Sequence, residues 1–270
     1  KDRIQGFFEQ MKKERVAFIG AGVSHRQLIE LFARKGISVT LRDKRSAQQL
    51  GEAYESLKAL GVRMVLGEDY LENVDDTVIF RTPGINFFHP ALVKAREKGV
   101  AVTSEMEVFF QLCPCPIYAV TGSDGKTTTT TIISELLKAQ GYTVHLGGNI
   151  GRALLPIVEA ISPEDRAVVE LSSFQLISMR QSPQVAVVTN ISPNHLDVHK
   201  DMQEYIDAKK NILLHQDGFS QTILNADNPD TIALKELVRG KLSSFSRRRG
   251  PMERGTWLDE KGMIWVKDKG

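Results

Sequence analysis

Short apolar runs alternate with helix-compatible segments along the first 110 residues. The runs typical of buried strands are 16–20, 39–41, 62–65, 77–80 and 100–103. The segments with helical character between them are 26–35, about 47–60 and 90–99. Strands that alternate with helices predict a parallel sheet with right-handed crossovers.

A second block with the same alternation follows residue 116. Its predicted strands are 143–146, 167–171, 185–189 and 222–224, and its predicted helices are 127–140 and 204–214. Near the end, 256–258 and 263–266 flank a turn-like segment, 259–262, which is typical of a hairpin. Pro114 and Pro116 interrupt both helix and sheet between the blocks. We therefore expect an α/β protein of two domains, 1–113 and 117–270.

Composition places the chain among ordinary globular proteins, with 41% hydrophobic and 25% charged residues. The net charge of +2 argues neither for nor against nucleic acid, and the arginine run 247–249 reads as a solvated turn. No window approaches the ~18 apolar residues of a membrane span. The first residues contain no apolar signal region. We expect a cytoplasmic monomer with neither a nucleic-acid nor a membrane partner.

The two cysteines, Cys113 and Cys115, flank a single proline. A C-P-C pair without a second ligand pair does not make a zinc site. We expect reduced, structural thiols.

A glycine-flanked turn, T-G-S-D-G-K-T-T, joins an apolar strand to a helix-compatible segment. This order suits a polyphosphate, because loop N–H groups and the helix dipole face the anion. Lys126 would reach the β- and γ-phosphates, and Thr127 would ligate Mg²⁺. The loop is shorter than the full Walker pattern, since Val120 stands at the first glycine position. The alternative is an ordinary turn with a surface lysine. The predicted ATP-binding residues are Thr121, Gly122, Ser123, Asp124, Gly125, Lys126, Thr127 and Thr128.

Polar side chains follow two further strands of the second block. Glu170 ends one apolar strand, where it suits a Mg²⁺ ligand opposite the phosphate loop, and the alternative is a salt-bridged glutamate. After the next strand, the His-x-Asp-x-His spacing of 195–199 is that of a metal site or of a solvated loop. His195 is the favoured residue, because it lies nearest the strand end.

Two other features are ambiguous by themselves. Lys209, in the segment Y-I-D-A-K, has the pattern of a helix-surface lysine. The segment G-G-N-I-G at 147–151 permits close backbone approach to a ligand, or is only a turn.

The first block opens with G-A-G-V-S-H, which is similar to a dinucleotide fingerprint but has His25 at the third glycine position. Asp43 ends the second strand, where an acid that binds a ribose or a base is expected. We expect a nucleotide other than a dinucleotide near this helix, and the alternative is a pure scaffold.

Taken together, these motifs resemble the Mur ligases, ATP-dependent amide-forming enzymes of bacterial cell-wall synthesis. The resemblance rests on the phosphate loop, G-G-N-I-G, E-L-S-S-F-Q-L from Glu170, N-H-L-D-V-H from Asn194 and Y-I-D-A-K. The first block fits as well, through G-A-G-V-S, D-K-R and T-P-G-I. E-L-S-S-F-Q-L with G-G-N-I-G is specific to the branch that adds D-glutamate.

The resemblance implies the fold and the reaction. It implies a Rossmann-like domain that binds a UDP-linked substrate, then a central P-loop ATPase domain that is incomplete at its C-terminus, with a third domain absent from this chain. ATP would phosphorylate the carboxylate of UDP-N-acetylmuramoyl-L-alanine, and the amine of D-glutamate would attack the acyl phosphate. We do not expect the 270 residues to be fully active by themselves.

The resemblance also implies residue roles. Catalytic roles fall to Lys126, Glu170, His195 and Lys209. One Mg²⁺ would be held by Thr127 and Glu170, and a second by His195 and a carbamylated Lys209, since a cationic lysine cannot ligate a metal. The implied substrate-binding residues are Val23, Ser24, Asp43, Lys44, Arg45, Gly84, Asn149, Ser172, Gln175 and His195.

Two other functions remain open at this stage. One is a non-catalytic module that binds a nucleotide or a UDP-sugar. The other is a different ligase, either another Mur ligase or one like folylpolyglutamate synthase.

Overall fold

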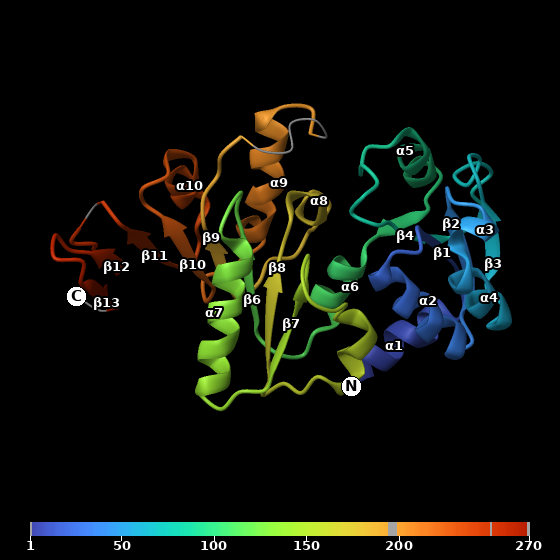
Figure 1. Cartoon of the computed structure of the whole chain (residues 1–270), viewed down its shortest axis with the longest axis horizontal. Helices are drawn as coiled ribbons and strands as arrows, with labels where there is room; N and C mark the ends of the chain where they lie inside the picture. Colours follow the sequence, from blue (N-terminus) through green and yellow to red (C-terminus); the bar gives the residue numbers. More distant parts are fainter. Residues whose placement is uncertain (1, 194–198, 249, 269–270) are drawn as a thin grey trace. The chain divides into compact units, whose positions relative to one another are not determined.

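The computed structural model describes residues 2–193, 199–248 and 250–268 and forms two compact units (Figure 1). The first unit comprises residues 1–112 together with 152–160, and the second comprises 113–151 together with 161–270. A short segment from the middle of the chain thus belongs to the first unit.

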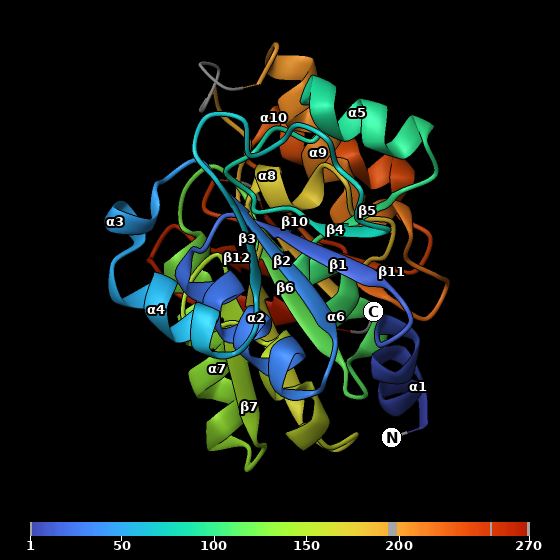
Figure 2. The same ribbon diagram turned by 90° about the vertical axis from the view of Figure 1, so that its right-hand side faces the viewer.

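The first unit is built on a five-stranded sheet with the order β3-β2-β1-β4-β5, and every strand pair is parallel. Figure 2 shows β1, β2 and β4 side by side. Its elements are α1 (Asp2–Met11), β1 (Arg15–Ile19), α2 (Val23–Arg34), β2 (Ser38–Asp43), α3 (Ala47–Leu50), α4 (Glu52–Ala59), β3 (Arg63–Leu66), β4 (Val78–Phe80), α5 (Pro90–Glu97), β5 (Ala101–Thr103), α6 (Glu105–Leu112) and the 3₁₀ helix η1 (Leu155–Ala160). The parallel α/β arrangement expected for this block is confirmed.

One helical expectation needs correction, and one helix was missed. The helix expected at 47–60 is two helices, because Gly51 has φ +56°, a left-handed conformation that ends α3 and begins α4. The first helix, α1, was not predicted at all. Its signal is the spacing of Ile4, Phe8 and Met11, which puts all three side chains on one buried face.

Aromatic rings fill the space between α1, α2 and the sheet. Phe32 makes edge-to-face contacts with Phe8 and Phe80, at centroid distances of 5.7 and 5.5 Å. Phe18 stacks on Phe80 at 4.8 Å. Such pairs add about 0.5–1.5 kcal/mol each beyond their burial.

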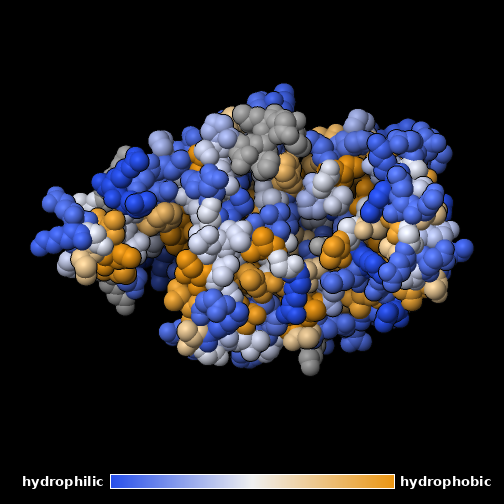
Figure 3. All heavy atoms as spheres, in the orientation of Figure 1, coloured by the Kyte–Doolittle hydropathy of each residue, from blue (hydrophilic) through white to orange (hydrophobic). Residues whose placement is uncertain are grey.

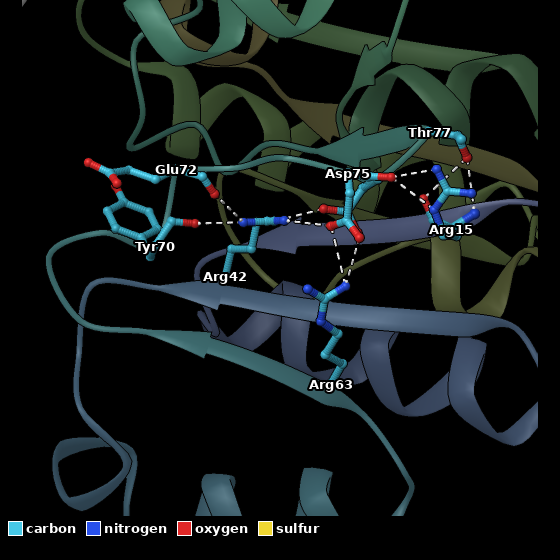
Figure 4. A network of polar contacts seen from close by, with 8 residues as sticks. Arg15, Arg42, Arg63, Tyr70, Glu72, Asp75 and Thr77 are labelled. Atoms are coloured by element: carbon cyan, nitrogen blue, oxygen red, sulfur yellow. Dashed lines mark hydrogen bonds and ion pairs between the residues drawn. The ribbon is translucent and has the colours of Figure 1, made fainter.

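A polar network reinforces the sheet next to this core (Figure 4). Arg42 is almost fully buried and forms an ion pair with the equally buried Asp76 at 2.7 Å. It also contacts Asp75, at 3.3 Å, which pairs with the exposed Arg63 at 3.1 Å. The carbonyl oxygen of Tyr70 accepts a further hydrogen bond from Arg42. Removing one partner of a buried pair costs several kcal/mol, so this network holds the loop before β4 to the sheet.

Glu105, at the start of α6, holds the inserted segment within the first unit. Its buried carboxylate accepts hydrogen bonds from the N–H groups of Leu154 and Leu155, at 3.0 and 2.9 Å. Burial raises the pKa of Glu105, although both backbone donors act to lower it.

The second unit is built on an eight-stranded sheet with the order β13-β12-β11-β10-β9-β6-β8-β7, in which only β12 and β13 are antiparallel. Its elements are β6 (Ile117–Thr121), α7 (Lys126–Ala139), β7 (Val144–Gly148), β8 (Arg166–Glu170), α8 (Ser173–Leu176), β9 (Val185–Val188), α9 (Met202–Leu214), β10 (Gln221–Asn225), α10 (Pro229–Ala233), the 3₁₀ helix η2 (Leu234–Leu237), β11 (Lys241–Ser246), β12 (Gly255–Leu258) and β13 (Ile264–Lys267). The expected terminal hairpin is confirmed, whereas β11 was not predicted.

The terminal hairpin exposes apolar side chains, at the left of Figure 3. Met263, Ile264, Trp265 and Val266 are 61%, 74%, 54% and 70% exposed. Within the residues that the structure describes, no helix combines the length and the apolar character needed to cross a membrane.

Candidate functional site

The phosphate loop lies between β6 and α7, as the sequence predicts. Gly125 is the N-cap of α7 and has φ +76°, and it carries no side chain that could occupy the first-turn N–H groups. A helix N-terminus of this kind presents its N–H groups and the positive end of its dipole to a ligand. Local structure alone therefore creates a site for an anion.

The segment after β9 holds this loop in place. Asn190 accepts from Ser123 N through its carbonyl oxygen and from Asp124 N through its side chain, both at 2.9 Å. Thr189 donates its hydroxyl to the carbonyl oxygen of Asp124 at 2.7 Å. On the other side, the hydroxyl groups of Ser123 and Tyr205 lie 2.9 Å apart. Sequence reasoning gave no role to Thr189, Asn190 or Tyr205.

Gly122 allows the loop to approach this segment. Its φ of +152° lies in the region that favours glycine. A Cβ atom there would lie 1.9 Å from the Thr189 Oγ1 and 3.1 Å from the carbonyl oxygen of Asn190. No other residue fits without moving the loop.

Glu170, at the C-terminal end of β8, is 1% exposed and lies opposite the first turn of α7. Its two carboxylate oxygens accept hydrogen bonds from the Thr127 hydroxyl at 2.7 Å and from the Asn149 side-chain amide at 2.8 Å. Gly148 has φ +99°, and a Cβ there would lie 2.2 Å from the Glu170 carbonyl oxygen, so this glycine permits the approach of 148–149. Hydroxyl and carboxylate oxygens are the donors that Mg²⁺ prefers, and this pair fits one Mg²⁺ ion.

Two lysines converge on the phosphate loop. Lys126 donates to the carbonyl oxygens of Gly122 and Ser123 at 3.0 and 2.9 Å. Lys209, on α9, donates to the same Gly122 carbonyl at 2.9 Å and to the Thr121 hydroxyl at 3.3 Å. Because Lys209 is only 1% exposed, its interpretation as a helix-surface lysine is wrong.

The buried position of Lys209 changes its chemistry. Burial lowers the pKa of Lys209 to about 7, and the positive charge of Lys126 acts in the same direction. The lowered pKa favours the neutral amine, which is the protonation state that reacts with CO₂ to form a carbamate.

The segment E-L-S-S-F-Q-L begins at the end of β8 and continues into the short helix α8. Ser172 caps this helix and forms a reciprocal capping box with Gln175. The next residue, Ser173, lies 2.8 Å from Nε2 of His199, whose Nδ1 lies 3.0 Å from Glu204 on α9. His199 therefore links α8 to α9, a role that its place in the His-x-Asp-x-His spacing did not indicate.

His195, expected as a metal ligand and substrate contact, lies outside the described residues, as do Asn194 and Asp197. Among the described residues of the second unit, the expected metal ligands Thr127, Glu170 and Lys209 all lie next to the phosphate loop. Over the described ranges, His, Cys, Asp and Glu side chains do not assemble in groups of three or more that could hold a metal ion.

The first unit contains the other expected site. Asp43, at the end of β2, accepts hydrogen bonds from Ala21 N at 2.8 Å and from the Arg45 guanidinium at 2.7 and 3.0 Å. Burial acts to raise the pKa of Asp43, but the hydrogen bonds from Arg45 and Ala21 hold it below its usual range. The carboxylate therefore joins two loops, and its oxygens already have donors.

The fingerprint departs from a dinucleotide site at its third glycine. His25 is buried there, with Nδ1 3.0 Å from the carbonyl oxygens of both Ile19 and Gly20. Burial lowers the pKa of His25, which favours the neutral ring. Val23 begins α2 with its side chain 83% exposed, followed by Ser24.

The first unit contains two more of the expected substrate-binding residues, Lys44 and Gly84. The exposed Lys44 amine is 3.6 Å from Glu68. Gly84 has only Thr82 atoms near its missing Cβ, at 4.0 Å, so it leaves open space.

The sequence matches the model of the Mur ligase middle domain over residues 120–256, which is half of the chain and includes the phosphate loop, Glu170 and Lys209. The chain belongs to the Mur ligase family. The α/β fold expected from the resemblance is thereby confirmed.

Curated Mur ligases with a known assignment are close in sequence. The chain is 47% identical over 261 residues to UDP-N-acetylmuramoylalanine--D-glutamate ligase of Clostridium kluyveri, covering 96% of this chain and 57% of that protein. It is 47% identical to the enzyme of the same name from Acetivibrio thermocellus, covering 97% and 56%. The relative from Clostridium tetani is 46% identical, with 97% and 58% covered. The chain thus spans a little over half the length of these relatives.

Solved Mur ligase structures share the fold. The UDP-N-acetylmuramate:L-alanyl-gamma-D-glutamyl-meso-diaminopimelate ligase from Neisseria meningitides matches with a TM-score of 0.60 at 16% identity, covering 94% of this chain and 84% of that one. The UDP-N-acetylmuramate-alanine ligase from Thermotoga maritima matches with a TM-score of 0.51 at 20% identity, covering 91% and 54%. At these identities the likeness concerns the fold alone.

Proposed function

We propose that the complete protein is an ATP-dependent ligase that joins D-glutamate to UDP-N-acetylmuramoyl-L-alanine during peptidoglycan precursor synthesis. The observation that supports this most is the convergence of Lys126, Glu170 and the buried Lys209 on the phosphate loop, within a Mur ligase middle domain. The 47% identity to relatives named for this reaction supports the choice of substrates.

The physical difficulty of the reaction is electrostatic, because a substrate carboxylate must approach the γ-phosphate of ATP. The N–H groups at the start of α7 bind the phosphates, and Lys126 leaves its loop carbonyls to neutralise charge on the transferred group. The carboxylate becomes an acyl phosphate, the amine of D-glutamate attacks its carbonyl carbon, and phosphate leaves.

Mg²⁺ neutralises phosphate charge when it is bound. Thr127 and Glu170 would hold one ion, replacing their mutual hydrogen bond, and Asn149 keeps the Glu170 carboxylate oriented. For a second ion we propose His195 and carbamylated Lys209. The amine of Lys209 cannot ligate a metal, but its lowered pKa of about 7 supplies the neutral form that carbamylation requires.

In the same proposal, the first unit binds the UDP group of the substrate near α2 and β2. The Asp43–Arg45 pair shapes the loop after β2. The resemblance to Mur ligases supports Val23, Ser24, Lys44 and Gly84 as further residues of this site. NAD is disfavoured, because the buried His25 stands at the third glycine position of the dinucleotide fingerprint. Ser172 and Gln175, which cap α8, and His195 are proposed to contact the remainder of the substrate.

Phosphate release by the complete protein tests the activity. Lys126→Ala should reduce D-glutamate-dependent release by at least about 10³-fold, because one charged group at a transferring phosphoryl contributes several kcal/mol. Lys138→Ala is the matched control, since Lys138 lies on the same helix and forms a surface ion pair with Glu135. Near-normal turnover of Lys126→Ala would contradict the assignment.

Two comparisons separate this function from the alternatives. Screening candidate amino acids as acceptors distinguishes a D-glutamate ligase from other Mur ligases and from a folylpolyglutamate synthase-like enzyme. If no candidate amino acid supports phosphate release, a non-catalytic module is favoured. Calorimetric titration with UDP-N-acetylmuramoyl-L-alanine and with NAD tests the first unit. Tighter binding of NAD would reverse its assignment.

A further inference from the structure

The C-P-C segment has no part in the ligase chemistry, yet its two sulfur atoms face each other. The Sγ atoms of Cys113 and Cys115 lie 3.6 Å apart, in van der Waals contact. Both thiols are free, Cys115 is 4% exposed and Cys113 is half-buried. The segment directly precedes β6, at the opposite end of that strand from the phosphate loop.

We propose that Cys113 and Cys115 form a reversible dithiol–disulfide site that exchanges with small-molecule disulfides. The thiolate of one cysteine attacks the external disulfide RSSR and releases one RSH, which leaves a mixed disulfide. The second cysteine then attacks the protein sulfur of that mixed disulfide, closes the Cys113–Cys115 bond and releases the second RSH. The protein loses two electrons and two protons, and RSSR becomes two RSH.

The geometry favours closure over a stable mixed disulfide. The bond needs the sulfurs to approach from 3.6 Å to about 2.05 Å. Only Pro114 separates the cysteines, and the fold already holds their sulfur atoms in contact, so little side-chain freedom remains to be lost on closure. The two sulfur atoms are already in contact, so the second attack, which closes the Cys113–Cys115 bond, needs little movement of the chain.

The surroundings also support thiolate chemistry at Cys115. A hydrogen bond from the Cys113 thiol lowers the pKa of Cys115, while burial and the charge of Asp165 oppose this. The same shared proton raises the pKa of Cys113. Asp165 is itself paired with His145 at 2.8 Å. A thiolate held next to a thiol is the arrangement from which intramolecular exchange proceeds.

The experiment equilibrates the 270-residue protein with oxidised and reduced glutathione at a series of ratios, followed by acid quenching, maleimide labelling and intact mass measurement. We expect the native protein to lose the mass of two hydrogen atoms, to protect both cysteines from maleimide and to recover them on reduction. Cys113→Ser and Cys115→Ser should instead retain a glutathione adduct or a free thiol.

Repeating the equilibration in concentrated urea tests whether the fold builds the site. We expect closure at a lower ratio of oxidised to reduced glutathione in the native protein than in urea. The proposal fails if the native protein accumulates glutathione adducts without closing. It fails equally if closure is as favourable in urea, because then the spacing alone and not the structure brings the sulfurs together. Neither outcome depends on ligase activity.

Discussion

The buried ammonium group of Lys209 should lower the free energy of unfolding, and Lys209→Met should remove this penalty. The side chain is 1% exposed, and burial lowers the pKa of its ammonium group from 10.5 to about 7. The folded chain thus binds this proton more weakly than the unfolded chain. The resulting penalty is full below pH 7, shrinks as the pH rises from 7 to 10.5 and vanishes above that range.

The magnitude follows from the lowering of the Lys209 pKa from 10.5 to about 7. At 1.36 kcal/mol per unit, the penalty is about 4 kcal/mol at pH 7 and about 2 kcal/mol at pH 9. Methionine loses the hydrogen bonds to Gly122 and Thr121, but Gly122 O still accepts from Lys126 and the Thr121 hydroxyl still donates to Leu171. Those losses cost about 1 kcal/mol each. Lys209→Met should therefore be about 2 kcal/mol more stable than the wild type at pH 7.

Urea unfolding at pH 7 and pH 9, in buffer freed of CO₂ so that the lysine stays an amine, measures the difference. The chain has two tryptophans, Trp257 and Trp265, and both lie in the second unit, so their fluorescence reports the unit that contains Lys209. The control is Lys210→Met, because Lys210 is the next residue of α9 but pairs with Asp207 nearer the surface. It should gain no stability.

Two results would refute the reasoning. One is a Lys209→Met variant that is no more stable than the wild type at pH 7. The other is a gain that does not decrease by about 2 kcal/mol between pH 7 and pH 9, because desolvation of a charge must follow its titration. In the complete protein, the same variant should lose ligase activity, and Lys209→Arg should not restore it.

Three further substitutions test the site. Gly122→Ala should abolish ATP binding in a titration and cost more than about 2 kcal/mol in urea unfolding, because its Cβ would meet Thr189 at 1.9 Å; unchanged binding would contradict the loop geometry. Glu170→Gln should keep the fold, seen by circular dichroism, but weaken Mg²⁺-dependent ATP binding at least about tenfold, and equal Mg²⁺ dependence would exclude it as a ligand. His199→Ala should lower unfolding stability by about 1–3 kcal/mol, because Ser173 loses its hydrogen-bond partner, and a change below about 0.5 kcal/mol would refute the α8–α9 link.

The sequence predicted those parts of the protein that are set locally. The strand, glycine turn and helix around Lys126 follow from hydrophobic pattern and turn chemistry within a dozen residues, and the terminal hairpin follows from the turn at 259–262. The helix break at Gly51 has an equally local cause, but the helical pattern on both sides concealed it. The α1 helix was missed although its apolar spacing was readable.

The surroundings of the functional groups were decided by the tertiary structure. The local pattern around Lys209 is that of an exposed helix lysine, and only the packing of α9 beneath a loop 88 residues earlier in the chain buries the amine and lowers its pKa. The partners of Asp43 and the contact of Thr189 with the phosphate loop depend likewise on segments that meet only after folding. The local sequence pattern specifies which functional groups are available. Burial and hydrogen-bond partners set the charge of those groups, and both are supplied by residues distant in sequence.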